Sequence, residues 1–290
     1  MDIQTQLEAA LQDAQAGRFS EAEAKLVAIL QPQLSDNDTA TIQGILGAVY
    51  ASMGDHAAGA RELARAAAVN LDDASIQSNL CNCLTQTGAL NEAIAAGSAA
   101  TGINPGFVEA HNNLGNAHKA AGDFDQAAQS YRQALQINPG YAVAHNNLGL
   151  VLFVAGDLPG AAASYQMALQ HRPDYAAAHY NLADVYRGSG DLDNALALCE
   201  RALQLGPYRA EAHQNMAVVL RDRGETEKAL ASFRRALDIA PGDEEAVKGI
   251  GEVLMEVGRH AEGLEVLANT FGVIRFEAGA GVSVKYGDWP

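Results

Sequence analysis

Residues 108–175 consist of two consecutive copies of one 34-residue unit. The first reads VEAHNNLGNAHKAAGDFDQAAQSYRQALQINPGY, and AVAHNNLGLVLFVAGDLPGAAASYQMALQHRPDY follows it without a gap. The period extends in both directions, because glycines recur every 34 residues at Gly54, Gly88, Gly122, Gly156, Gly190, Gly224 and Gly258. A fixed period of this length is typical of a repeat array, in which each repeat packs only against its neighbours.

Glycine and proline divide each repeat into two predicted helices. The glycine suits the left-handed backbone that ends a helix. A proline, which cannot continue a helix, closes the second one at Pro105, Pro139, Pro173, Pro207 and Pro241. Gly17 precedes Gly54 by 37 residues, so the first repeat has three extra residues near residues 31–36.

Small and large residues occupy fixed places in the repeat when Val108 and Ala142 are numbered as position 1. Positions 8, 20 and 27 are almost always Gly, Ala or Cys, which favours close contact between two helices. Position 24 is the large partner in most repeats: Leu63, Tyr131, Tyr165, Cys199, Phe233 and Leu267.

This pattern of L-G, G-D, A-x3-F/Y, A-L and P resembles the tetratricopeptide repeat. The resemblance implies an all-α, right-handed superhelical solenoid of about eight helix-turn-helix repeats over residues 3–270. The expected repeats are residues 3–39, 40–73, 74–107, 108–141, 142–175, 176–209, 210–243 and 244–270. The AHNNLGN motif is most similar to the repeats of the O-linked N-acetylglucosamine transferase and of bacterial proteins of that subclass.

Residues 271–290 depart from the repeat. FGVIRFE and GVSVKYG alternate apolar and polar residues and are separated by AGAG, which predicts a short β-hairpin-like tail. Its exposed strand edges could pair with another molecule, or the tail could begin a second domain.

An asparagine ladder is the main candidate binding feature. The resemblance implies that positions 2, 5, 6, 9, 12 and 13 face a concave groove. Position 6 is asparagine in five consecutive repeats, although asparagine is not a strong helix former: Asn79, Asn113, Asn147, Asn181 and Asn215. In the transferase such a ladder holds a peptide main chain, and an amide offers the matching donors and acceptor. The alternative is that these amides bond only to neighbouring helices.

Further candidates surround the ladder. Neutral polar groups come from Asn82, Asn112, Asn116 and Asn146, and a sparse basic line at position 12 comes from Lys119, Arg187 and Arg221. Leu150 and Phe153, with Tyr180 one repeat later, form a predicted apolar patch that could anchor a ligand side chain, unless Phe153 folds back against the helices. The basic residues that a two-carboxylate clamp needs are missing from the required positions.

Two departures from the family pattern need explanation. Position 4, often Trp in the family, is His111, His145, His179 and His213. Equivalent residues of adjacent repeats lie ~8–10 Å apart, too far for ligands that must each lie ~2 Å from one zinc ion, so core or edge roles are expected. Position 24 of the third repeat is Gly97, which predicts either a space filled by neighbours or a hinge or contact surface.

Composition excludes several classes of function. The net charge of −16 argues against a general nucleic-acid binder and against binding to anionic membranes. No membrane span or signal peptide is evident, and three cysteines do not suggest a disulfide framework, so a cytoplasmic location is expected. No phosphate-binding, nucleophile-elbow or zinc-protease motif occurs, so we expect no cofactor and no enzymatic activity.

The sequence therefore predicts a non-enzymatic scaffold that binds an extended peptide or disordered protein segment in the concave groove. One alternative is the substrate-recognition arm of a larger or partner glycosyl-, sulfo- or methyltransferase. A second is a self-assembling scaffold that forms a homo-oligomer through its tail or terminal repeats.

Overall fold

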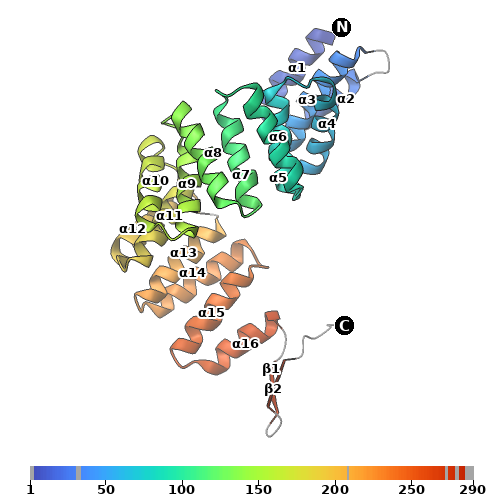
Figure 1. The fold of residues 1–290 in the computed structure, drawn as a ribbon. Coiled ribbons are helices and arrows are strands. Elements are labelled where there is room, and N and C mark those ends of the chain that lie inside the picture. The colour runs from blue at the N-terminus through green and yellow to red at the C-terminus, as the bar shows by residue number, and fades with distance from the viewer. Residues whose placement is uncertain (1–2, 31–33, 208, 272–273, 278–280, 285–290) are drawn as a thin grey trace. The chain divides into compact units, whose positions relative to one another are not determined.

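The computed structural model describes residues 3–30, 34–207, 209–271, 274–277 and 281–284. These residues form α-helices almost throughout, as the repeat pattern predicts (Figure 1). The chain divides into two compact parts, residues 1–157 and residues 158–290, and the boundary falls at a turn between two helices.

The N-terminal part contains nine helices among its described residues. They are α1 (Ile3–Gln15), α2 (Phe19–Ile29), α3 (Asp36–Ser52), α4 (His56–Val69), α5 (Ala74–Thr87), α6 (Leu90–Ile103), α7 (Val108–Ala120), α8 (Phe124–Ile137) and α9 (Ala142–Val154). Odd-numbered helices are the first helices of the repeats, and α5 and α7 of successive repeats lie in contact.

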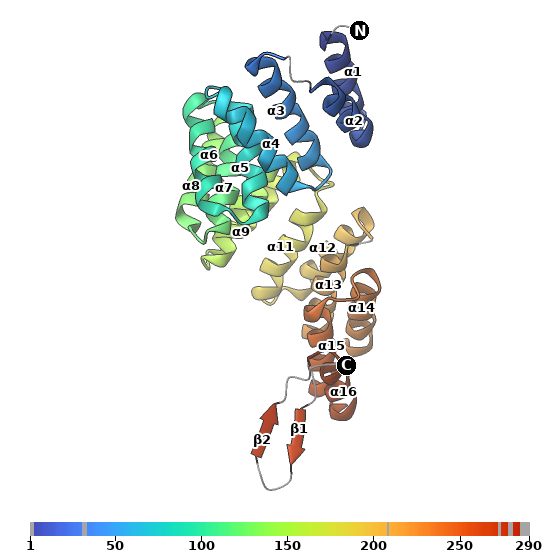
Figure 2. The same cartoon turned by 90° about the vertical axis from the view of Figure 1, so that its right-hand side faces the viewer.

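The C-terminal part continues the same succession of helix pairs (Figure 2). Its helices are α10 (Leu158–His171), α11 (Ala176–Gly188), α12 (Leu192–Leu205), α13 (Ala210–Asp222), α14 (Thr226–Ile239), α15 (Glu244–Glu256) and α16 (His260–Phe271). Two short strands follow, β1 (Ile274–Glu277) and β2 (Gly281–Val284), paired antiparallel with Ile274 opposite Val284. Residues 278–280, the centre of the predicted tail turn, lie outside the described residues.

The predicted turns between helices are confirmed. Each of the eight turn glycines has a positive φ, from 74° at Gly17 to 84° at Gly122. Residues with a Cβ rarely adopt this backbone, so glycine ends the first helix of every pair.

Large residues pack against small ones, as the positional pattern predicts. The ring of Tyr131 on α8 is so close to Gly115 on α7 that a Cβ at Gly115 would lie 2.6 Å from Tyr131 Cε1. Gly47 with Leu63, and Gly251 with Leu267, repeat this arrangement in other helix pairs. Glycine at position 8 therefore makes room for the large residue at position 24.

Gly97, which lacks the large side chain of its position, is buried in α6. A Cβ there would lie 2.9 Å from Cys81 Sγ and 3.1 Å from Leu114 Cδ1. Neighbouring side chains from α5 and α7 thus occupy the space, which is the first of the two alternatives that the sequence left open.

The four position-4 histidines hold the loops that precede their helices. His111 Nε2 lies 2.9 Å from the carbonyl oxygen of Pro105, and His145 Nε2 lies 2.8 Å from that of Pro139. His179 and His213 make the same bond to Pro173 and Pro207, at 2.9 and 3.1 Å. The histidines thus hold the loops between repeats in place by hydrogen bonds at the edges of the repeats.

Candidate binding surface

Two of the ladder amides of the N-terminal part, Asn113 and Asn147, bond from one repeat to the next. Asn113 on α7 donates to the hydroxyl of Ser78 on α5 at 3.0 Å and lies 3.3 Å from the Ser78 carbonyl oxygen. Asn147 on α9 donates to the side-chain oxygens of Asn112 and Asn116 at 3.0 and 3.2 Å. Position 6 of one repeat is therefore tied to position 5 of the repeat before it.

Burial separates these amides into two groups. Asn112, Asn146 and Asn147 are buried, with exposed fractions of 4%, 4% and 9%. Half-buried amides, which retain access to solvent, are Asn79, Asn82, Asn113 and Asn116. Asn116 also accepts a hydrogen bond from the hydroxyl of Tyr131 at 2.8 Å. The sequence did not distinguish the groups, because half-buried Asn113 and buried Asn147 stand at the same position of the same AHNNLG motif.

Lys119 and the apolar residues of α9 are the remaining predicted site residues of this part. Lys119 is half-buried, and burial lowers the pKa of its amine. Leu150 and Phe153 are also half-buried, whereas the adjacent Val154 is 60% exposed.

In the C-terminal part the predicted basic line is neutralised by acids. Arg187 lies 3.4 Å from Asp184 and 3.3 Å from Asp222, while Arg221 lies 3.5 Å from Asp222 and 2.9 Å from Glu252. These ion pairs connect α11, α13 and α15. Because each arginine is paired with two acids, neither is a free anion-binding group. Sequence spacing identified the cations but not the acids on adjacent helices.

Tyr180, Asn181 and Asn215 are half-buried on the first helices of this part. Burial raises the pKa of Tyr180, and the positive charge of Arg209 acts in the opposite direction. Asn215 lines a cavity of about 310 Å³ with neighbours that include Val218, Arg221 and Glu252. Tyr180 lies in the C-terminal part and Phe153 in the N-terminal part.

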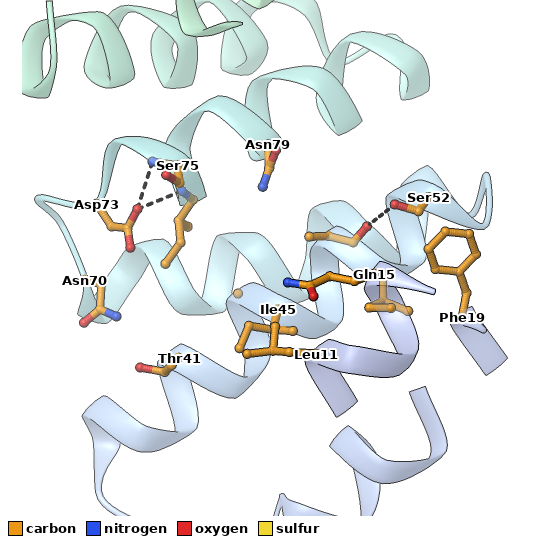
Figure 3. Close-up of a pocket in the computed structure, with 15 residues that line it drawn as sticks. Leu11, Gln15, Phe19, Thr41, Ile45, Ser52, Asn70, Asp73, Ser75 and Asn79 are labelled. Carbon is orange, nitrogen blue, oxygen red and sulfur yellow. Dashed lines mark hydrogen bonds between the residues drawn. The ribbon is translucent and has the colours of Figure 1, made fainter. Parts of the chain in front are cut away.

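An apolar cavity that the sequence interpretation missed lies at the first three repeats (Figure 3). It has a volume of about 450 Å³ and is formed by α1, α3, α5 and residues next to them. Leu11, Phe19, Ile45 and Ile76 contribute its apolar wall, and Asn79 lies at its edge on α5. Five α3 residues that line it stand at positions 2, 5, 6, 9 and 13: Thr41, Gly44, Ile45, Ala48 and Ser52.

A signal for this cavity was present in the sequence. Position 6 is Ile45 in the second repeat, where the next five repeats have asparagine. This exchange of an amide for an apolar side chain marks a change in the surface of the first helices. The recurring asparagine is the stronger pattern in the sequence, and a single exception to it does not by itself indicate a cavity.

The described residues show no group of three or more His, Cys, Asp or Glu side chains placed to hold a metal ion. Cys81, Cys83 and Cys199 are free and buried, and burial raises the pKa of Cys83 to about 11 and of the other two to about 12. Such thiols are protonated at neutral pH and are poor nucleophiles. None of the described helices combines the length and apolar character that a membrane span requires.

Comparison with solved structures shows many similar helical-repeat chains. A chain in the crystal structure of the APC/C hetero-tetramer Cut9–Hcn1 is 18% identical, with a TM-score of 0.71 over 87% of this chain and 48% of that one. This chain therefore spans about half of that one. A tetratricopeptide repeat protein of Parabacteroides merdae is 17% identical, with a TM-score of 0.70 over 87% of this chain and 98% of its own.

A tetratricopeptide repeat protein of Thermus thermophilus is 26% identical, with a TM-score of 0.56 over 63% of this chain and 99% of its own. No curated protein sequence matches this chain significantly. Family models described as tetratricopeptide repeat match residues 46–106, 112–176 and 174–242, which together include well over half of the chain. They do not single out the transferase subclass that the AHNNLGN motif resembles. The chain belongs to the tetratricopeptide repeat family.

Proposed function

We propose that this protein is an interaction scaffold that binds extended segments of partner proteins on the surface of its first helices. Membership of the tetratricopeptide repeat family supports a role in protein interaction. The observation that carries the proposal is the half-buried amide surface of α5 and α7, formed by Asn79, Asn82, Asn113 and Asn116.

The hydrogen bonds within the chain favour a particular way of holding a peptide. Both side-chain hydrogen bonds of Asn113 use its amide nitrogen, so its carbonyl oxygen has no partner among the described residues. A carbonyl oxygen fixed by bonds at its own nitrogen is ready to accept from a peptide N–H. In this proposal Asn113 and Asn79 contact the peptide main chain, while buried Asn147 and Asn112 hold the neighbouring helices in place.

Asn181 and Asn215 of the C-terminal part are also assigned to contact with the peptide, because both stand at position 6 of their repeats and are half-buried. The arginines there hold the repeats together, because Arg187 and Arg221 are each paired with two acids. Lys119 is the basic residue that we assign to ligand contact, because it has no ion pair among the described residues.

Peptides selected from a random library on the immobilised full chain test the proposal. Their affinity would be measured by fluorescence anisotropy for the chain and for an Asn79→Ala/Asn113→Ala variant. Two lost hydrogen bonds at ~0.5–1.5 kcal/mol each predict a fall of about 5-fold to 150-fold. The control is Gln129→Ala/Gln133→Ala, which removes two exposed amides from α8. Equal affinities for both variants, or failure to select any peptide, would refute the proposed surface.

A further inference from the structure

An acidic groove adjoins the apolar cavity of Figure 3 within the N-terminal part, since the two have lining residues in common. The groove has a volume of about 770 Å³ and shares Thr41, Asn70 and Asp73 with the cavity. Asp72, Leu71 and Val69 are among its other lining residues. A ligand that entered the cavity could therefore extend directly into the groove.

The charged residues that line this region are acidic. Neither the cavity nor the groove has a lysine or arginine among its described lining residues. One carboxylate oxygen of Asp73 accepts from the backbone N–H groups of Ser75 and Ile76 at 2.8 and 3.1 Å, which caps α5. Its second oxygen has no partner among the described residues, and Asp72 is exposed. The groove thus favours a cationic group over an anionic one.

Apolar surface extends beyond the cavity itself. In the groove, Leu71 is 68% exposed and Val69 is 48% exposed. In the cavity, Leu11 on α1 and Ile45 on α3 both line the wall (Figure 3). Covering such surface is favourable by ~25 cal/mol per Å² of apolar area removed from water. A partner that combines an apolar side chain with a positive charge matches both features.

We propose that this cavity is the anchor site for one class of partner: an extended segment with a large apolar side chain next to a lysine or arginine. The apolar side chain enters between Leu11, Phe19 and Ile45, and the cation pairs with Asp73 and Asp72. Asn79 lines the cavity and is also the first amide of the proposed peptide surface, so one segment can occupy both. The inference rests on the proposed function and specifies which segments bind.

The probes are fluorescein-labelled octapeptides of Gly and Ser that each contain one Leu and one Arg. In the three peptides of the set, Arg stands one, two or three residues after Leu. Anisotropy with the full chain should show binding for at least one spacing. That peptide should lose at least tenfold in affinity when Leu becomes Ala, and several-fold when Arg becomes Gln. Equal or tighter binding with Glu in place of Arg would overturn the charge assignment.

Two changes in the chain test the two halves of the site. Ala48→Leu fills the cavity at a half-buried helix position and should weaken the Leu–Arg peptide at least tenfold. Asp72→Asn/Asp73→Asn keeps a side chain that can cap α5 but removes both charges. It should weaken the Arg peptide several-fold and leave the Gln peptide unchanged. The control is Asp125→Asn, an exposed acid on α8.

The outcomes separate this inference from the proposed function. If library-selected peptides lose affinity in Asn79→Ala/Asn113→Ala but not in Ala48→Leu, the surface stands and the anchor site is wrong. If no Leu–Arg peptide binds at any spacing, the anchor site is also wrong. A doubled mass in light scattering that Ala48→Leu abolishes would assign the cavity to a second copy of the chain and overturn the proposal.

Discussion

The side-chain nitrogen of Asn147 lies 3.0 Å from the side-chain oxygen of Asn112, 35 residues earlier, and both side chains are buried. Asn113 has the same relationship to Ser78, also 35 residues earlier, at 3.0 Å. The ladder is therefore part of the packing between repeats of the N-terminal part. Its contribution to stability can be measured separately from any contribution to binding.

Asn147→Leu is expected to destabilise the chain. The change removes the amide N–H of Asn147 that donates to the buried side-chain oxygen of Asn112. Leaving a buried acceptor unpaired lowers the free energy of unfolding by ~1–3 kcal/mol. Asn79→Leu is the control, because Asn79 is half-buried and has no hydrogen-bond partner among the described residues, so a change within ~0.5 kcal/mol is expected. Urea unfolding followed by circular dichroism compares the two variants. Equal losses would contradict a structural role for the Asn147 bonds.

Two glycines of α6 should respond to alanine in opposite directions. A Cβ at Gly97 would crowd Cys81 Sγ and Leu114, so Gly97→Ala should destabilise by ~1–3 kcal/mol from overpacking, less the helix-propensity gain. A Cβ added at Gly102 would meet nothing within 4 Å, and the φ there is ordinary for a helix, so Gly102→Ala should stabilise by ~0.5–1 kcal/mol. Thermal unfolding midpoints give the comparison. A higher midpoint for Gly97→Ala would mean that the site is not tightly filled.

His145→Phe keeps an aromatic ring but removes the bond to the carbonyl oxygen of Pro139. The expected loss is ~0.5–1.5 kcal/mol. His111→Phe removes the equivalent bond to Pro105, so the double variant should show the sum of the two single losses, because these bonds share no partner. Hydrogen exchange in the loop at residues 138–141 should also accelerate in His145→Phe. Unchanged exchange there would show that the histidine does not fasten the loop.

The stability of the first repeat is expected to depend on pH through the carboxyl of Asp13. Hydrogen bonds from Lys25 and Arg18 lower the pKa of its carboxyl below the ordinary 3.8. Because the folded pKa is lower than the unfolded one, the stabilisation is complete above the unfolded value and is lost as pH falls through the folded value. Asp13→Asn should therefore be less stable than the natural chain at pH 7, and the difference should shrink below about pH 4.

The control for this pH dependence is Glu8→Gln, an exposed acid on the same helix. Its stability relative to the natural chain should stay nearly constant between pH 7 and pH 3. A difference for Asp13→Asn that persists unchanged at pH 3 would exclude the charged hydrogen bonds as its cause.

The helices and turns were predictable because each repeat follows the same local rules. Glycine with positive φ, proline after the second helix, and Gly115 facing Tyr131 all follow from short-range geometry. The environment of a side chain was less predictable, because it depends on the repeat beside it. Asn113 and Asn147 share one motif, yet the first is half-buried and the second is buried.

The candidate cavity could not be predicted from the recurring residues, because it arises where the recurrence stops. Ile45 interrupts the asparagine series, and Gly44 brings α3 close enough to α5 that a Cβ there would lie 3.2 Å from Ile76 Cδ1. The acids that pair with Arg187 and Arg221 were likewise hidden, since two of the four pairs join residues 31 and 35 positions apart on adjacent helices.

The histidine bonds also decide where this array can be cut. His111 belongs to the repeat that begins at Val108, but its partner Pro105 belongs to the repeat before it. A protein engineer who joined fragments at the helix start would separate each histidine from the loop that it holds. The unit of this chain that can be transferred with its histidine bond intact runs from one proline to the next.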